Sequence, residues 1–140
     1  MGNKPDIATL IPYRIVGDSV SVYLQKRTTD AELFPGLFGF FGGKVEVGES
    51  VEDGLRREVK EELDFVPNGY EKLGIYESSK IRHIFVLEVG EDFEIKVKVL
   101  EGEYGRFFNE EEVASEPKFI KVNRPILQDL YKFVRQREKI

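Results

Sequence analysis

Cysteine is absent from the 140-residue sequence, and histidine occurs once, at position 83. Without thiols the chain can form no disulfide, no thiolate metal site and no cysteine nucleophile. A single imidazole also excludes a zinc site built from several histidines. Apolar runs long enough to span a bilayer and an N-terminal signal-peptide pattern are missing as well. We therefore expect a cytoplasmic protein with no membrane partner.

Basic residues are not in excess, because 26 acidic side chains outnumber 21 basic ones and give a net charge of −5. An acidic chain is a poor general binder of nucleic acid polymers, although a small nucleotide can still bind together with a cation. Hydrophobic residues make up 41% of the chain, which is ordinary for a globular protein. No repeat or linker divides the sequence, so we expect one domain over residues 1–140.

Short runs of β-branched and aromatic residues alternate with turn-forming residues, a pattern typical of strands joined by tight turns. Other stretches carry apolar residues every three or four positions, as amphipathic helices do. This order favours an α/β fold with a mixed sheet between helices. The expected strands are residues 7–16, 20–25, 33–41, 72–77, 81–89 and 93–100, and the expected helices are residues 51–63, 109–113 and 125–136.

The helix expected at residues 51–63 is the most informative element. Ser50 is placed to cap its first turn, with Asp53 three positions on, as in a capping box. The apolar stripe of this helix consists of Val51, Leu55, Val59 and Leu63. Glu62 falls inside the angular range of that stripe, and Glu58 lies just outside its edge. Glu61, three residues after Glu58, is within reach of a shared ligand.

Carboxylates aimed at a core are costly unless something compensates, and clustered carboxylates also repel one another. A hard divalent cation resolves both problems, and Mg²⁺ prefers oxygen ligands that it shares with substrate phosphates. Glu58, Glu61 and Glu62 are therefore candidate ligands for Mg²⁺, with Mn²⁺ as an alternative. Taken alone, however, paired glutamates more often mark a solvated, acidic helix end.

The full pattern around this helix resembles the signature of the Nudix hydrolases, within residues 43–65. The matching residues are Gly43, Glu49, Arg57, Glu58, the aliphatic Val59, Glu61 and Glu62. A coincidental match of so many fixed residue types is improbable at average composition. The resemblance implies the α/β/α sandwich of that family, with a mixed β-sheet between helices.

Two positions depart from the family pattern. Asp64 stands where a glycine is usual, just past the helix, where a left-handed residue is required. Aspartate adopts that conformation at a cost of about 1–2 kcal/mol, so we expect a local effect on stability and none on the chemistry. Phe41 stands where proline often precedes the paired glycines Gly42 and Gly43, so we expect a less rigid loop.

The resemblance also implies a reaction, the hydrolysis of a nucleoside diphosphate linked to another group by attack of water on phosphorus. Glu58, Glu61 and Glu62 would hold Mg²⁺, and the main-chain carbonyl of Gly42 would be a further ligand. Gly42 and the adjacent Gly43 suit this position, because glycine lets the backbone approach a metal ion closely.

Two supporting roles follow from the same resemblance. Arg57 would pair with Glu49 and hold the loop against the helix, although a surface pair of Arg57 with Glu61 or Asp53 is the alternative. The general base would be either a glutamate of the helix or one from a later loop. Glu101 matches that later position, and Glu103 is a near alternative. A solvated loop carboxylate is the plainer interpretation of both.

Within the family the chain looks most like the MutT type, the pyrophosphohydrolases that clear oxidised purine nucleoside triphosphates such as 8-oxo-dGTP. Four positions match the base-recognition set of that branch: Arg27, Phe40, Arg82 and Asn123. An asparagine amide can read a purine edge, and arginine can stack on a base or donate in a fork. Each has a plainer alternative, since Asn123 could cap the last helix, Phe40 could be core, and the arginines could be surface charges.

Two other functions remain open at this point. The first is hydrolysis of ADP-ribose or a nucleotide sugar, although Lys80 and Ile81 stand where that branch carries its marker proline. The second is a Nudix-fold module that binds a nucleotide without cleaving it, although such modules usually lose the glutamates that are present here. In each case the expected partner is a small nucleotide, and the chain is expected to be a monomer or a homodimer.

Overall fold

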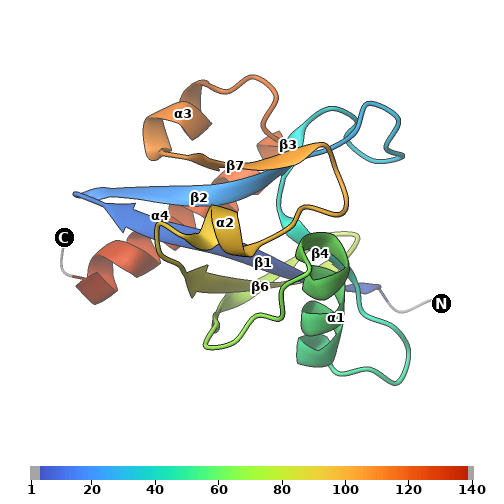
Figure 1. The fold of residues 1–140 in the computed structure, drawn as a ribbon. Coiled ribbons are helices and arrows are strands. Elements are labelled where there is room, and N and C mark those ends of the chain that lie inside the picture. The colour runs from blue at the N-terminus through green and yellow to red at the C-terminus, as the bar shows by residue number, and fades with distance from the viewer. Residues whose placement is uncertain (1–3, 139–140) are drawn as a thin grey trace.

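A mixed β-sheet forms the centre of the protein, in a computed structural model that describes residues 4–138 (Figure 1). The strands are β1 (Asp6–Val16), β2 (Ser19–Lys26), β3 (Phe38–Gly39), β4 (Phe41–Lys44), β5 (Glu71–Glu77), β6 (Ile81–Glu88) and β7 (Tyr104–Phe108). The helices are α1 (Val51–Leu63), α2 (Phe93–Lys96), α3 (Glu110–Ser115), the 3-10 turn η1 (Lys121–Asn123) and α4 (Arg124–Glu138).

The sheet has the strand order β3-β2-β1-β6-β5, and β4 and β7 pair with β1 and β2 respectively. Strands β1 and β6 are parallel, whereas the other named pairs are antiparallel. Both central strands are buried on both faces, which explains their nearly continuous runs of apolar residues. The sheet is thus mixed, as the sequence predicts.

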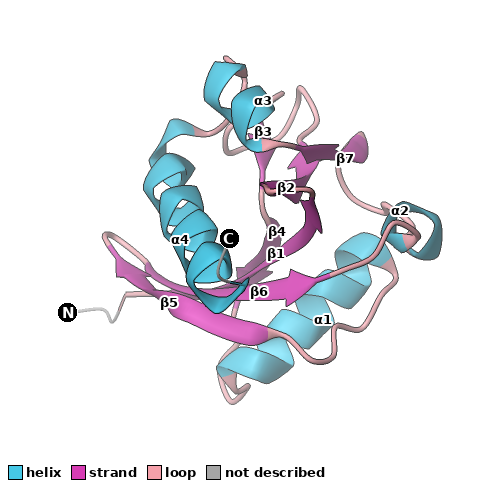
Figure 2. Ribbon diagram, turned by 90° about the vertical axis from the view of Figure 1, so that its left-hand side faces the viewer, coloured by secondary structure: helices cyan, strands magenta, loops and turns pink. Residues whose placement is uncertain are grey.

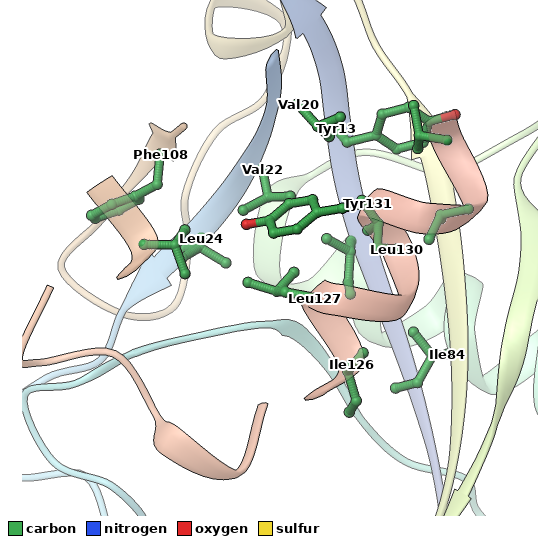
Figure 3. Close-up of a cluster of buried hydrophobic side chains, with 14 of the residues drawn as sticks. Tyr13, Val20, Val22, Leu24, Ile84, Phe108, Ile126, Leu127, Leu130 and Tyr131 are labelled. Atoms are coloured by element: carbon green, nitrogen blue, oxygen red, sulfur yellow. The ribbon is translucent and has the colours of Figure 1, made fainter. Parts of the chain in front are cut away.

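Helices α1 and α4 cover opposite faces of this sheet (Figure 2). Two apolar clusters result, one on each face, because successive strand side chains point to opposite sides. On the α4 face, Leu127 and Leu130 pack against Ile84 and Val22 (Figure 3). On the α1 face, the stripe of Leu55, Val59 and Leu63 packs against Leu10, Phe41 and Phe85. The α/β sandwich is therefore confirmed.

Helix α1 has the ends that the sequence predicts. Ser50 Oγ accepts a hydrogen bond from the Asp53 main-chain N–H at 3.1 Å. The Asp53 carboxylate pairs with Arg56 at 2.7 Å, so the N-cap is confirmed whereas the reciprocal half of a capping box is not formed. Asp64 adopts the left-handed conformation (φ 50°, ψ 44°), and its N–H donates to the Lys60 carbonyl.

The prediction of a strand at residues 93–100 is wrong. Phe93 opens the short helix α2, and Phe93 and Val97 both enter the α1-face core at a spacing that suits a helical turn. The following residues run along the C-terminal end of α1, where the Lys98 and Leu100 N–H groups donate to the carbonyls of Leu63 and Glu62 at 2.9 and 2.7 Å. A helix end leaves such carbonyls without partners, and this segment satisfies two of them.

Smaller differences concern the C-terminal half. Strand β7 was not expected, and the stretch at residues 33–41 contains a loop before the short strands β3 and β4. Asn109 caps α3 through a complete capping box with Glu112, and α3 ends two residues beyond the helix expected at residues 109–113. Among residues 4–138, no helix combines the length and apolar character needed to cross a bilayer.

Candidate active site

The glutamates of α1 differ sharply in environment. Glu62 is only 6% exposed, as its place within the apolar stripe predicts, and its carboxylate accepts a hydrogen bond from the Gly42 main-chain N–H at 2.7 Å. Glu58 is half-buried, and Glu61 is exposed. The helix therefore presents one carboxylate in the core, one at its margin and one in solvent.

Burial raises the pKa of the Glu62 carboxyl to about 8. The negative charges of Glu101 and Glu58 add to this rise, while the Gly42 hydrogen bond and the Arg27 cation oppose it. Burial also raises the pKa of Glu58, against the opposing hydrogen bond from Arg57. Two neighbouring carboxyls thus have raised pKa values, as expected of clustered, desolvated acids.

The paired glycines are required by close packing. Gly42 has a φ of +133°, and a side chain there would overlap the carbonyl oxygen of Ala8 on β1. A Cβ atom at Gly43 would overlap the carboxylate of Glu58. The Gly42 contact holds strand β4 against the backbone of β1, where only glycine fits, and the Gly43 contact brings β4 against the Glu58 carboxylate of α1.

Arg57 holds the loop before α1 against the helix. Its Nε and Nη2 atoms donate to the two carboxylate oxygens of Glu49 at 2.8 and 3.1 Å, so the pair implied by the family resemblance forms as a two-bond fork. Nη2 also donates to the Lys44 carbonyl at 3.0 Å, and Nη1 reaches Glu58 at 2.8 Å and Glu61 at 3.3 Å. The expected pair and the alternative pair with Glu61 therefore coexist. The hydrogen bond from Arg57 is the main cause of the lowered pKa of Glu49.

Of the two later glutamates, Glu101 adjoins the α1 carboxylates. It directly follows Leu100, whose N–H is bonded to the Glu62 carbonyl, and its charge raises the pKa of both Glu58 and Glu62. Glu103 instead faces Lys26, with 3.8 Å between Nζ and the carboxylate. The backbone docked on the end of α1 explains why a residue so distant in sequence reaches this place.

A cavity of about 560 Å³ opens beside these carboxylates. Its lining includes all four residues matched to base recognition: Arg27, Phe40, Arg82 and Asn123. Gly42 lines the same cavity, so one residue joins the cavity to the Glu62 carboxylate. Sequence reasoning missed the rest of the wall, which includes Phe34, Tyr76 and the turn at residues 77–80.

Asn123 is not a helix cap. It ends η1, which runs straight into α4, and its N–H already donates to the Ile120 carbonyl at 3.0 Å. The side chain is 3% exposed, and within residues 4–138 nothing donates a hydrogen bond to its Oδ1 atom. A buried acceptor without a donor is costly, so this amide is poised for a partner that the protein itself does not supply.

The other three residues take intermediate positions in the cavity wall. Arg82 is half-buried, burial lowers its pKa, and no described residue forms a hydrogen bond or ion pair with its guanidinium. Arg27 donates from Nε to the Leu33 carbonyl at 2.8 Å, which fixes its side chain rather than leaving it as a mobile surface charge. Phe40 packs edge-on against Phe119, with 6.3 Å between ring centres, so it belongs to both the core margin and the cavity.

The donor set suits a divalent cation in its chemistry. Glu58, Glu61 and Glu62 offer only oxygen, and the pKa values of Glu58 and Glu62 are raised first by burial and then by neighbouring negative charge, both of which a cation would offset. Within residues 4–138 no three acidic or histidine side chains already converge as a finished metal cage. Glu58 is engaged by Arg57 and Glu62 by Gly42, so these carboxylates would exchange those hydrogen bonds for the ion.

Comparison with known proteins agrees with this geometry. The NUDIX domain model matches residues 6–130. A nucleoside triphosphatase NudI of Escherichia fergusonii is 52% identical over 40 residues, which are 29% of this chain and 28% of that protein. An ADP-ribose pyrophosphatase of Methanocaldococcus jannaschii is 40% identical over 82 residues, 54% of this chain and 47% of that protein. The matches thus span at most about half the length of these relatives.

Solved structures give the same result for the fold. One comes from a study of MutT from Aliivibrio salmonicida and Vibrio cholerae, and its TM-score is 0.73 at 21% identity. The superposition covers 93% of this chain and 98% of the other. At this identity the likeness establishes the architecture alone. Since the family model matches most of the sequence, the chain belongs to the NUDIX domain family.

Proposed function

We propose that this chain is a divalent-cation-dependent hydrolase of nucleoside diphosphate linkages, of the MutT type. It would convert a nucleoside triphosphate and water into a nucleoside monophosphate and pyrophosphate, with oxidised purine nucleotides such as 8-oxo-dGTP as candidate substrates. One observation carries the proposal: Gly42 lines the cavity of about 560 Å³, and its main-chain N–H also donates to the buried carboxylate of Glu62. A nucleotide bound there has its phosphates beside the glutamates.

In this proposal Glu58, Glu61 and Glu62 hold Mg²⁺ or Mn²⁺, with the Gly42 carbonyl as a further ligand. When bound there, such an ion would supply charge neutralisation for the phosphates and activation of the attacking water. Arg57 pairs with Glu49 and thereby holds the loop before α1 in place beside the phosphates. Glu101 serves as the general base and takes a proton from the attacking water onto its carboxylate.

The cavity supplies the selectivity. Asn123 and Arg82 carry polar groups without partners among the described residues, and a purine edge would satisfy both. Phe40 offers a ring face or edge to the base, and Arg27 stands between the base and the phosphates. A base that leaves these buried groups unpaired would be rejected, because unpaired polar groups in a closed site are costly.

A second candidate is hydrolysis of ADP-ribose or a nucleotide sugar. The identity to the M. jannaschii ADP-ribose pyrophosphatase favours it, as does the extension of the cavity to the hydroxyls of Ser78 and Ser79. Lys80 and Ile81 in place of the marker proline count against it. A purely binding module has less support, because every glutamate of the family signature is present.

One experiment separates these candidates. The protein is incubated with each ordinary dNTP, 8-oxo-dGTP, ADP-ribose and GDP-mannose, with Mg²⁺, with Mn²⁺ and with EDTA, and the products are identified by mass spectrometry. Pyrophosphate from a triphosphate supports the first candidate, whereas direct release of orthophosphate contradicts it. Reaction in ¹⁸O-labelled water identifies the phosphorus that is attacked. Turnover in EDTA would contradict the metal assignment.

The proposal also places the enzyme in the cytoplasm as one NUDIX domain, acting on free nucleotides as a monomer or a homodimer. Cell fractionation tests the location. Size-exclusion chromatography with light scattering tests the oligomeric state.

A further inference from the structure

Gln25 lies between the cavity and the loop that carries Glu101. It sits near the end of β2, is 3% exposed, and uses both ends of its side-chain amide. Nε2 donates to the main-chain carbonyl of Glu101 at 3.1 Å, and Oε1 accepts from Nη1 of Arg27 at 3.5 Å. One buried side chain therefore touches a residue of the cavity wall and the residue proposed as the general base.

The loop after Glu101 is packed tightly on the same strand end. Gly102 has a φ of +84°, and a Cβ atom there would lie 2.8 Å from Gln25 Cγ and 2.8 Å from the Lys26 carbonyl oxygen. The Glu103 N–H donates to that carbonyl at 2.8 Å. The backbone of residues 101–103 thus rests on Gln25 and Lys26, and Gln25 contacts it both by packing and by a hydrogen bond.

Arg27 is fixed from the other side. Its Nε is bonded to the Leu33 carbonyl, so Gln25 and Leu33 together define where the guanidinium points within the cavity. The positive charge of Arg27 also reaches Glu62, where it opposes the rise in pKa. Gln25 hence links Arg27, whose charge acts on the buried Glu62 carboxylate, directly to the Glu101 loop.

We propose that Gln25 is a positioning residue that fixes the position of the Glu101 carboxylate relative to Arg27. The proton acceptor then lies at the correct distance from a substrate bound in the cavity. This inference rests on the proposed function. A small displacement of a catalytic group is enough to lower turnover strongly, because the rate depends on near-attack geometry. A merely structural amide would instead affect stability and leave the chemistry of the folded enzyme unchanged.

The test uses Gln25→Met, which keeps the length and volume of the side chain but removes both hydrogen bonds. The matched control is Val22→Ala on the same strand, a core truncation away from the Glu101 loop. With the best substrate of the panel, Gln25→Met is expected to lower kcat about ten-fold or more with KM changed less than about three-fold. Val22→Ala is expected to lower Tm and to retain wild-type kcat when measured well below its Tm.

A double-mutant cycle with Glu101→Gln tests whether Gln25 acts through Glu101. If it does, adding Gln25→Met to Glu101→Gln lowers kcat by less than about two-fold, since the group being positioned is already gone. Two effects that multiply independently would overturn the inference. Equal kcat for wild type and Gln25→Met would overturn it as well.

Gln25→Glu is the second variant, and it keeps the acceptor for Arg27 while removing the donor to the Glu101 carbonyl. It is expected to lower kcat and to change the pH dependence of kcat; a wild-type pH profile with wild-type kcat would contradict the inference. The two proposals fail separately. A wild-type protein that hydrolyses none of the nucleotides refutes the proposed function, whereas an active wild type with unaltered Gln25 variants refutes only the role of Gln25.

Discussion

The carboxylate of Glu62 and the main-chain N–H of Gly42 are joined by a hydrogen bond of 2.7 Å, in a place where the side chain is almost fully buried. That single bond offsets only part of the cost of burial, so the pKa of Glu62 rises from an ordinary 4.5 to about 8. Between these values the folded protein holds a proton that the unfolded chain has lost. Stability therefore falls as the pH rises through this window.

Glu62→Gln removes this titration while keeping an oxygen that accepts from Gly42. We expect the variant to gain stability relative to wild type as the pH rises from about 5 to about 8, with the difference constant above that range. Thermal unfolding in EDTA at pH 5, 7 and 9 measures it. A Tm difference that is equal at all three pH values would refute the raised pKa. Turnover with Mg²⁺ is expected to fall at least ten-fold, because the proposed ion loses a charged ligand.

Gly43→Ala is expected to displace Glu58. The added methyl group would occupy the place of the Glu58 carboxylate, so turnover should fall about ten-fold or more and the Mg²⁺ concentration for half-maximal activity should rise. Gly48→Ala is the matched control, because Gly48 has a φ of +86° and no neighbour within 4 Å. It should cost about 1 kcal/mol of stability and leave the Mg²⁺ dependence as in wild type. Identical Mg²⁺ curves for both variants would argue against the role of Glu58.

Asn123→Ala tests the base site. Because the Asn123 amide caps no helix, its removal is expected to leave Tm nearly unchanged and to lower the ratio of kcat/KM values for 8-oxo-dGTP over dGTP. Asn109→Ala is the control, since Asn109 does cap α3 with a 2.8 Å bond from the Glu112 N–H. That control should lose about 1 kcal/mol of stability with the ratio intact. A constant ratio in Asn123→Ala would remove the main support for oxidised purines.

Tyr131→Phe is expected to stabilise the protein. The hydroxyl of Tyr131 points toward Val22 (Figure 3), and no described residue forms a hydrogen bond with it, although Glu110, Arg135 and Arg124 are near enough to affect its pKa. Its removal should therefore raise the free energy of unfolding by about 1 kcal/mol, visible as a Tm higher by a few degrees. In the control Tyr13→Phe the lost hydroxyl accepts from Arg137, so stability should not rise. A fall in the Tm of Tyr131→Phe would show that this hydroxyl has a partner.

Patterns local to one element were predictable from the sequence. The cap at Ser50, the left-handed Asp64 and the burial of Glu62 all depend on positions along α1, whereas the pair between Arg57 and Glu49 was expected from the family resemblance. The four cavity residues were found from the resemblance alone, since no spacing rule links positions 27, 40, 82 and 123. Their roles in binding stay predictions.

What the sequence left out depends on contacts between distant segments. Residues 93–100 alternate like a strand, yet they do not form one. Phe93 and Val97 are buried together in the core, and the residues after them donate hydrogen bonds to the last carbonyls of α1. Asparagine is a common N-cap residue, but Asn123 already lies in the helical turn η1 and therefore does not cap α4. Gln25 has no distinguishing pattern at all, because its importance lies in two contacts made across the fold.

The cavity wall and the glutamates come from different parts of the chain. The glutamates belong to one helix, whereas much of the wall belongs to surface connections, among them the turn at residues 77–80 and Phe34 in the loop before β3. Loops accept substitution and insertion more readily than the elements they join. Directed evolution confined to residues 28–37 and 77–80 is therefore expected to change which nucleotides the cavity accepts, while the glutamates of α1 remain unaltered.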